Sequence, residues 1–434
     1  MEAVAREGRV DLEAVEQVLR AAVLEAGARV LEQLLEAVGV GRRVTKASCP
    51  RCGAAMESRG VCAKGVVTLL GWVRFARSRY VCPRCKATRF PGDEALGIVK
   101  TSRSPGVQRL EARFGAKETF KEVAEDLRLA AGIAVSAKDA ERVAEEIGHT
   151  VEQWVQRECT EQRRTDPVPS DGPPVETLYV QFDGTGVPMV AAELAGRKGK
   201  QPDGTAKTRE VKLGCVFTQT ACDDAGHPVR DPASTTFVGA IESAEPFGWR
   251  IYGEARRRGL DGAGQVVTIT DGAEWAKNLA QTHFPNAEHI VDFYHAAEHV
   301  ARLAKLLYER NPKFLDAQRE RWTTDLYEGR VQDVIGQASA LLPKPRDAMK
   351  DARKEIAYFA KNKDRMKYDR YRARGLFIGS GVIEAGCKHL IGHRLKQSGM
   401  EWTVRGANAI IALRCAILSR RFEDFWEQRR ASTG

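Results

Sequence analysis

Two apolar runs that each end on an aspartate and a glycine constrain the fold of this 434-residue chain most strongly. The run Thr177–Phe182 leads into Asp183-Gly-Thr-Gly, and the run Gln265–Thr270 leads into Asp271-Gly. Short runs rich in β-branched and aromatic residues, bounded by glycine, are typical of strands. The sequence therefore predicts two buried strands that each end by delivering a carboxylate to the edge of a sheet.

The elements around these runs follow an informative order. The predicted strands are Thr177–Phe182, Arg209–Thr218, Thr235–Ala240, Val266–Thr270 and Glu288–Phe293, and the predicted helices are Phe247–Arg258, Trp275–His283 and one that continues from His295. This order matches the ribonuclease H-like α/β fold, which has three strands followed by a helix, a strand, a helix and a strand. In that fold the first and fourth strands are neighbours. We therefore expect Asp183 and Asp271 side by side at one sheet edge.

Two neighbouring carboxylates need a cation or a proton between them. Unit charges about 4 Å apart repel by about 4 kcal/mol at an effective dielectric constant near 20. Carboxylate oxygens suit Mg²⁺ or Mn²⁺ better than zinc, and two such ions about 4 Å apart activate a water or a 3′-hydroxyl for phosphodiester chemistry. Such a site needs a third acid: Glu384, on a predicted helix after Gly379-Ser-Gly, is the best candidate, and Glu401 competes with it.

Four of the ten cysteines form two Cys-Pro-Arg-Cys pairs on either side of a predicted hairpin, Gly65–Val81. Two such knuckles turn four thiolates toward one point, as a closed structural zinc site requires. The sequence therefore predicts a zinc ribbon whose metal ligands are Cys49, Cys52, Cys82 and Cys85. Cys62 is a spare cysteine or an alternative ligand.

The net charge of +10 is unevenly distributed. Between Gly41 and Phe90 there are twelve Lys or Arg residues and one acid, whereas Val175–Val300 holds twelve basic and seventeen acidic residues. A concentrated basic patch indicates a polyanionic partner such as nucleic acid, although a basic surface also serves solubility. The predicted DNA contacts are Arg74, Arg77 and Arg79 in the zinc ribbon and Lys388, Arg394 and Lys396 near the third acid.

Helices are predicted on both sides of the zinc ribbon. The apolar spacing from Val10 to Val40 predicts one packing or dimerising helix. Farther along, a helix over Lys117–Ala130, a turn at Gly132 and a helix capped by Ser136 form a helix-turn-helix-like pattern. The second helix is rich in acids, so a DNA reader and a packing helix pair both remain open.

Four segments in this order resemble bacterial insertion-sequence transposases of the DDE type. They are Phe182-Asp-Gly-Thr-Gly, Thr270-Asp-Gly-Ala-Glu-Trp, Val291-Asp-Phe-Tyr-His and Gly379-Ser-Gly-Val-Ile-Glu followed by Arg394-Leu-Lys-Gln-Ser-Gly-Met. The group that the chain resembles is the Kra-type insertion-sequence family, which is related to the Mutator-like transposases, and the similarity runs from about Ser48 to Phe425.

The resemblance implies roles for individual residues. It maps Asp183, Asp271 and Glu384 to the metal-binding catalytic triad, and Asp292 and His295 to an Asp-x-x-His motif after the second aspartate. It also implies a helical domain inserted between Asp271 and Glu384, with basic stretches that contact transposon ends. Two Mg²⁺ or Mn²⁺ ions per active site and one structural Zn²⁺ are the implied cofactors.

Other enzyme classes fit the residues less well. A phosphoaspartate phosphatase needs a nucleophilic aspartate where Gln181 stands, and a zinc peptidase needs a glutamate where Ala296 follows His295. Glycoside hydrolysis also uses paired carboxylates but gives no reason for a zinc ribbon. The remaining alternative is a non-catalytic DNA-binding protein, such as a repressor or a domesticated transposase remnant.

We therefore expect a multidomain α+β protein that cleaves transposon ends and joins 3′-hydroxyl ends to target DNA. Its partners would be double-stranded DNA and further copies of the chain, as a homodimer or larger assembly. No signal peptide or transmembrane run is evident, so the expected location is the bacterial cytoplasm, at the nucleoid. The expected segments are 1–45 (helix), 46–95 (zinc ribbon), 104–160 (helix-turn-helix-like), 165–174 (linker), 175–300 (core), 301–375 (helical insertion) and 376–434 (core, C-terminal helices and basic tail).

Overall fold

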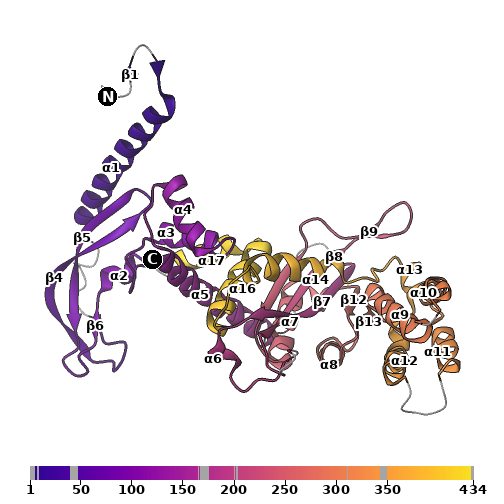
Figure 1. Ribbon diagram of the computed structural model, residues 1–434. Coiled ribbons are helices and arrows are strands. Elements are labelled where there is room, and N and C mark those ends of the chain that lie inside the picture. Colours follow the sequence, from indigo (N-terminus) through magenta and orange to yellow (C-terminus); the bar gives the residue numbers. More distant parts are fainter. Residues whose placement is uncertain are drawn as a thin grey trace. The chain divides into compact units, whose positions relative to one another are not determined.

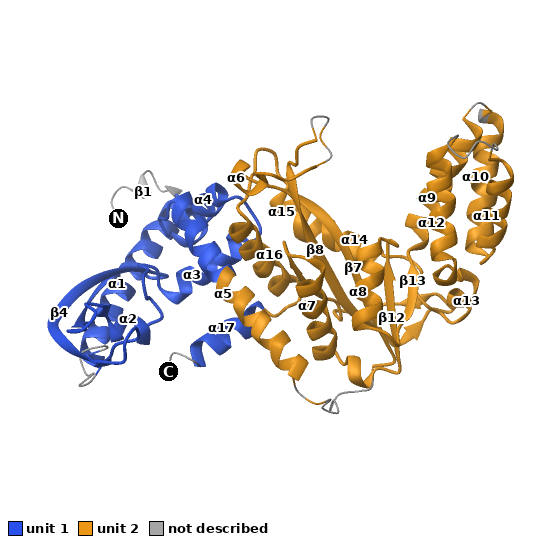
Figure 2. Cartoon of the chain, turned by 90° about the horizontal axis from the view of Figure 1, so that it is seen from below, with its two compact units in different colours: residues 1–148, 422–434 blue, residues 149–421 orange. Residues whose placement is uncertain are grey.

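The computed structural model describes residues 5–6, 9–39, 47–164, 166, 175–199, 201, 204–309, 311–342 and 349–431. The chain forms two compact units, which Figure 2 shows in different colours. Unit 1 comprises residues 1–148 and 422–434, and unit 2 comprises residues 149–421. The predicted linker 165–174 lies outside the described residues except for Asp166. No helix in the described ranges is both long enough and apolar enough to cross a membrane.

Unit 1 contains a four-stranded antiparallel sheet in the order β3-β4-β5-β6. The strands of unit 1 are β1 (Ala5–Arg6), β2 (Arg9–Val10), β3 (Ala47–Ser48), β4 (Ala55–Thr68), β5 (Gly71–Val81) and β6 (Thr88–Arg89). The predicted hairpin is longer than expected, because β4 already begins at Ala55 and its first residues pair with the β3 segment beside Cys49. Helix α1 (Leu12–Val38) packs on β5 through Leu35, which contacts a cluster of Val66, Phe75 and Ile98.

A helical group follows the sheet of unit 1. Its helices are α2 (Pro91–Ala95), α3 (Pro105–Gly115), α4 (Phe120–Ala131), the first part of α5 (Ala137–Arg164) and α17 (Phe422–Ala431). Val107 of α3, Val123 and Leu127 of α4, and Ile133 belong to a buried cluster shared with the start of α5. The turn predicted at Gly132 is present, with a left-handed φ of 68°, and Ser136 accepts the backbone N–H of Asp139 as expected. The boundary between the two units falls inside α5.

Unit 2 is built around a five-stranded mixed sheet in the order β11-β8-β7-β12-β13. Its strands are β7 (Thr177–Pro188), β8 (Thr208–Gln219), β11 (Thr236–Ala240), β12 (Gln265–Thr270) and β13 (Glu288–Val291), and β9 (Ala221–Cys222) and β10 (Pro228–Val229) form a separate pair. β8 is antiparallel to its neighbours, whereas β12 and β13 run parallel to β7. The first and fourth strands are therefore neighbours, as predicted, and the order is consistent with a ribonuclease H-like core.

The two faces of this sheet are covered by different helices. Val180 and Phe182 of β7 point to one face and pack against Phe247 of α7 and Leu279 of α8. The other face carries Tyr179, whose ring stacks on Phe217 and meets Phe377 edge-on. The helices of this unit outside the insertion are α6 (Ala191–Leu194), α7 (Ala244–Arg257), η1 (Leu260–Gly262), α8 (Glu274–His283), α14 (Gly381–Gly386), η3 (Cys387–Gly392), α15 (His393–Leu395) and α16 (Val404–Leu418).

A group of helices lies between β13 and α14 in the chain and forms the bundle drawn in orange in Figure 1. It consists of α9 (Phe293–Tyr308), α10 (Pro312–Tyr327), α11 (Val331–Ala340), α12 (Lys350–Asn362), η2 (Lys363–Arg365) and α13 (Tyr368–Ala373). Trp322 and Phe359 are fully buried within it. Residues 344–348 of the basic stretch Lys344–Lys354 lie outside the described residues.

One strand differs from its prediction in a way that matters for the site. The strand that carries Asp183 does not end at Phe182 but continues to Pro188. Residues Asp183–Pro188 keep antiparallel pairing with β8, from Leu213 to Thr208. The Gly-Thr-Gly sequence suggested a turn, but a complete ladder of backbone hydrogen bonds keeps it extended. Gly184 and Gly186 also leave room for Glu210 and Thr208, which would clash with added Cβ atoms.

Candidate active site and metal centre

The pairing of the central strands brings the two aspartates close together. Ile269 of β12 pairs with Gln181 of β7 in a parallel ladder. Asp271 and Asp183 each follow these residues by two positions, and their carboxylates are near enough for Asp271 to raise the pKa of Asp183. Neighbouring strands are about 4.8 Å apart. Beyond Gln181, β7 pairs with β8 and no longer with β12. Asp183 therefore lies just past the point where the pairing between β7 and β12 ends.

The segment 377–387 runs along the same face of β7. The buried Gln181 side chain donates to the Gly379 carbonyl oxygen at 3.2 Å and accepts the Ile383 N–H at 3.2 Å. Two residues farther, the Asp183 Oδ2 atom lies 3.8 Å from the Cys387 Sγ atom. Gln181 thus fixes the start of α14, and α14 brings its residues to the side of the sheet that carries Asp183.

Burial and repulsion act together on Asp183. Burial raises the pKa of this carboxyl above its ordinary value, and the nearby carboxylates of Asp271 and Glu384 raise it further. The backbone N–H of Gly184, 2.6 Å from Oδ1, opposes the increase. A divalent cation beside Asp183 would favour its charged form.

Asp271 is held in a tight loop at the end of β12. Its Oδ1 atom accepts the Ala273 N–H at 2.8 Å, and Gly272 has a left-handed φ of 86°. The hydroxyl of Tyr358, from α12, donates to the Asp271 carbonyl oxygen at 3.1 Å. An added Cβ at Gly272 would lie 3.1 Å from the Tyr358 ring, so this position requires glycine for conformation and for space. The helical group between β13 and α14 therefore contacts the backbone of the candidate site.

Glu384 belongs to a second cluster that also contains Asp292 and Ser380. The Ser380 hydroxyl lies 2.6 Å from Glu384 Oε1 and also contacts Asp292 Oδ2. One hydroxyl has a single proton to donate, so it cannot satisfy both carboxylates. Asp292 is 1% exposed, and burial raises its pKa, as does the nearby Glu384. Its other oxygen caps α9 by accepting the Tyr294 N–H at 2.7 Å.

The helix that carries Glu384 is irregular just after this residue. α14 passes into a π-helical segment, η3, and then into α15. π-Helical turns insert one extra residue per turn and frequently occur at functional sites. Cys387, the first residue of η3, faces Asp183, whereas Leu390 and Ile391 are fully buried. The irregular turn therefore separates the residues that face the acids from those that fill the core.

The acidic residues are near one another but do not form a closed ligand set. In the described part of the chain, one group of three or more metal-binding side chains has all its ligand atoms within 4.8 Å of one another, and it is the cysteine group. Asp183, Asp271 and Glu384 are therefore more widely spread than a closed metal site. Their oxygen ligands nevertheless fit a hard divalent cation, and the pKa of Asp183 is raised by burial and by the nearby carboxylates of Asp271 and Glu384.

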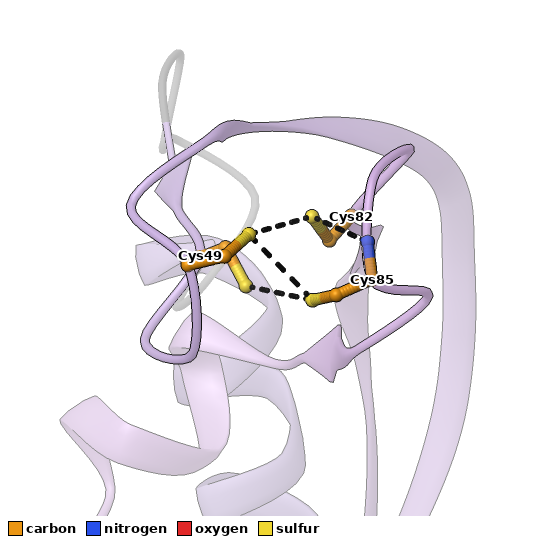
Figure 3. A group of neighbouring side chains, drawn as sticks. Cys49, Cys82 and Cys85 are labelled. Carbon is orange, nitrogen blue, oxygen red and sulfur yellow. Dashed lines mark hydrogen bonds between the residues drawn. The ribbon is translucent and has the colours of Figure 1, made fainter.

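Cys49, Cys52, Cys82 and Cys85 form this compact group. Figure 3 labels Cys49, Cys82 and Cys85 of the group. The Sγ atoms of Cys49 and Cys85 are 3.4 Å apart, and Cys52 lies 3.6 Å from Cys82 and 3.7 Å from Cys85. Tetrahedral zinc with Zn–S bonds of about 2.3 Å requires S···S distances of about 3.8 Å. The cluster therefore has the ligands and the spacing of a structural zinc site.

The two knuckles have the same backbone structure. Cys49 accepts the Gly53 N–H and donates to the Ala54 carbonyl, and Cys82 does the same with Lys86 and Ala87. The residue after the second cysteine has a left-handed φ in both knuckles, 71° at Gly53 and 60° at Lys86. Cys62 lies outside the cluster on β4, where its Sγ accepts from Arg77 at 3.0 Å.

Two of the predicted DNA contacts have side chains that are enclosed within the protein. Arg77 pairs with the buried Asp93 at 2.5 Å, its side chain is only 11% exposed, and its guanidinium lies over the Phe90 ring. Arg394 is fully buried, with its guanidinium 5.0 Å from the Trp402 ring centre. The sequence could not show these partners, because basic residues in a charged segment look alike until the fold assigns them a face.

The other four predicted DNA contacts are exposed. They are Arg74 and Arg79 on β5, Lys388 on η3 and Lys396 just after α15. Lys396 donates to the Thr185 hydroxyl at 2.6 Å, two residues beyond Asp183 on β7. A positive charge therefore lies beside the candidate site, where a phosphate could approach.

His295 lies one turn into α9 and is half-buried. Its ring is 5.1 Å from that of His299, which pairs with Glu355 at 2.5 Å and stacks on Tyr358. This network connects α9 to the helix that holds the Asp271 backbone. No local pattern in the sequence indicates Tyr358. Gln181 and Ser380 could have been noticed, because Gln181 is a polar residue inside an apolar strand and Ser380 lies in a Gly-Ser-Gly turn.

Comparisons with known proteins add little to this geometry. No protein-family model and no curated protein matches the chain. Among solved structures, the Drosophila P element transposase strand transfer complex aligns with 10% identity over 74% of this chain and 79% of that chain. The TM-score of this alignment is 0.24, a value at which the two chains do not superpose as a whole.

Proposed function

We propose that this chain is a DDE-type DNA transposase that cleaves at the ends of its element and joins the freed 3′-hydroxyls to target DNA. The observation that supports the proposal is the pairing of Ile269 with Gln181, two residues before Asp271 and Asp183, on the face of β7 along which the Glu384 segment runs. An open carboxylate site next to exposed basic residues favours a phosphodiester as substrate.

In this proposal Asp183, Asp271 and Glu384 hold two Mg²⁺ or Mn²⁺ ions. When bound, the ions supply activation of the attacking oxygen and stabilisation of the leaving oxygen. Ser380 positions Glu384 through its hydroxyl, and the buried Asp292 holds Ser380 in turn. Lys396 is placed to contact a DNA phosphate, since its ammonium already bonds the Thr185 hydroxyl at the site edge.

The remaining parts fit binding of duplex DNA. Arg51, Arg84 and Lys86 are exposed on the two knuckles, and Arg74 and Arg79 are exposed on β5. None of these five side chains forms an ion pair within the described ranges, which leaves their charge available for phosphates.

A strand-transfer assay tests the activity. The full chain is incubated with Mn²⁺, a supercoiled target plasmid and labelled duplexes taken from the sequences that flank its gene. The parent protein is expected to nick the duplexes and to join them to the plasmid. Asp183→Asn should lower both products by at least about 10³-fold, because removing one ligand disrupts the metal pair. Asp224→Asn, an exposed carboxylate in the β9–β10 loop, is the matched control and should leave both products unchanged.

The same assay separates the proposal from its alternative. Equal joining by the parent and by Asp183→Asn would contradict the active-site assignment. Duplex binding without cleavage by either protein would favour a non-catalytic DNA-binding protein.

A further inference from the structure

Helix α1 carries an apolar stripe on the side that faces away from its own unit. The stripe consists of Leu12, Leu19, Val23, Ala26, Val30 and Ala37. The four larger side chains, Leu12, Leu19, Val23 and Val30, are between 56% and 69% exposed. Single exposed apolar residues are common on proteins, but several of them along one side of a helix indicate an interaction surface.

The opposite side of α1 already has a partner. Ala28 is buried, Leu35 packs into the cluster beneath β5, and Gly27 lies 3.5 Å from the Leu70 side chain. Glu32 accepts the backbone N–H of Arg74 at 2.6 Å. A helix that is apolar on two sides is normally covered on both. Among the residues that the structure describes, the hairpin covers one side of α1 and the stripe is the side that remains exposed.

The spacing of the stripe identifies the kind of partner. Together with Glu16 and Gln33, its positions alternate in steps of four and three residues from Leu12 to Ala37. This is the a/d spacing of a coiled coil, sustained for more than three heptads. From Leu12 to Ala37 the stripe is about 38 Å long, at 1.5 Å per residue. Its partner should be a helix with the same length and the same spacing of apolar residues. A second copy of α1 has this length and this spacing.

The two polar positions fix the direction of pairing. In a parallel pair, Glu16 would face Glu16 of the other copy, and like charges repel. In an antiparallel pair centred between Val23 and Ala26, every a position faces a d position. Glu16 then faces Gln33, Leu12 faces Ala37, and Leu19 faces Val30. Shifting the pairing by one heptad would place Glu16 against Ala26, which leaves the carboxylate without a polar partner.

We propose that the full chain forms a homodimer through an antiparallel coiled coil of two α1 helices in this register. The Gln33 amide donates to the Glu16 carboxylate of the other copy, twice per dimer. The proposal is independent of the proposed enzyme activity, because it uses residues of unit 1 only and would hold equally for a DNA-binding protein without catalysis.

Sedimentation velocity of the full chain at micromolar concentration tests the dimer. The parent protein should sediment with twice the mass of the chain. The double variant Val23→Glu/Val30→Glu should sediment as a monomer, with at least about a 100-fold weaker dimer, because it places four charges in the seam. The control Val18→Glu/Val38→Glu adds the same charges to two exposed positions outside the stripe, and it should remain a dimer. Equal circular dichroism of both variants verifies that α1 is folded.

Gln33→Lys tests the direction. In the antiparallel register the new ammonium faces Glu16 and should tighten the dimer about fivefold. In a parallel pair it would face itself and weaken the dimer. A monomeric parent protein, or equal dissociation of the stripe and control variants, would overturn the interface. A weaker dimer of Gln33→Lys would overturn the antiparallel arrangement.

Discussion

The two candidate metal sites of this chain differ in how completely the protein assembles them. Four cysteine sulfur atoms lie within 4.8 Å of one another, whereas Asp183, Asp271 and Glu384 do not form so close a group. The backbone hydrogen bonds of the two knuckles hold the cysteines in place. Carboxylates at neutral pH repel one another, so their final approach depends on the cation.

This difference predicts different consequences of metal binding. At the cysteine cluster, the ion would hold together a small hairpin region whose own apolar cluster contains mainly Ala47, Met56, Tyr80 and the cysteines. At the acidic site, the sheet and its helices already have a large core, so the ion would change the local geometry and charge. One metal is therefore expected to stabilise the fold, and the other to complete the chemistry.

The largest expected effect is the loss of zinc. Cys82→Ser should abolish zinc binding and unfold the knuckle region, since structural zinc contributes on the order of 10 kcal/mol in small zinc domains. Metal analysis after dialysis should find about one zinc per parent chain, and proteolysis should cut the variant within residues 47–90. Cys62→Ser, a matched change in the same hairpin outside the cluster, should keep its zinc. If Cys82→Ser kept its zinc, zinc binding would not depend on the four-cysteine cluster, and the proposed difference between the two metal sites would be wrong.

The second effect is stabilisation by Mn²⁺. At a concentration 100 times its dissociation constant, Mn²⁺ should stabilise the zinc-loaded parent by about 2.7 kcal/mol, seen as a higher melting temperature by scanning calorimetry. Mn²⁺ should not raise the melting temperature of Asp183→Asn, because the substitution removes a metal ligand just past the end of the β7–β12 pairing. An unchanged response in Asp183→Asn would place the Mn²⁺ site elsewhere, whereas Asp224→Asn should respond as the parent does.

A third effect concerns pH in the absence of added divalent ions. Burial raises the pKa of Asp292, so its protonated form favours the folded state. The stability contributed by this proton is present at low pH and is lost as the pH rises through the raised pKa. Asp292→Asn stays neutral and keeps an acceptor for the Tyr294 N–H, so it should raise the melting temperature at pH 7.5 by about 2 °C. If Asp292→Asn melted at a lower temperature than the parent at pH 7.5, the inferred repulsion between Asp292 and Glu384 would be wrong.

The smallest effect is expected on DNA binding by the basic hairpin. Arg74→Ala/Arg79→Ala should reduce the slope of log K against log salt by about two for a duplex of any sequence. The control Arg59→Ala removes an exposed arginine that is already paired with Glu57 at 2.8 Å, and it should reduce the slope less. An unchanged slope for the double variant would remove β5 from the proposed DNA interface.

The sequence predicts the sheet well because its strands carry strong local signals. The apolar runs before Asp183 and Asp271 are short, β-branched and bounded by glycine, and their order specifies which strands are neighbours. The strand β7 is misjudged only at its end, where pairing with β8 overrides the preference of Gly-Thr-Gly for a turn. The cysteine cluster is predictable for a similar reason, since each knuckle is a local motif.

The parts that depend on distant partners are not predictable from local pattern. Arg77 pairs with Asp93 from α2, and Arg394 is enclosed beside Trp402. Tyr358 contacts the Asp271 backbone from 87 residues away in the chain. These contacts form only when the elements pack together. A prediction from charge and spacing alone therefore places Arg77 and Arg394 on the surface, although the fold encloses their side chains.

The central claim is that Asp183, Asp271 and Glu384 together hold a pair of divalent ions. Electron paramagnetic resonance of the zinc-loaded protein, titrated with Mn²⁺, tests it most directly, because two Mn²⁺ ions about 4 Å apart give a spin-coupled signal. The account predicts that signal at two Mn²⁺ per chain for the parent and its loss in Asp183→Asn. A parent protein that binds only isolated Mn²⁺, or an Asp183→Asn variant that keeps the coupled signal, would contradict the account.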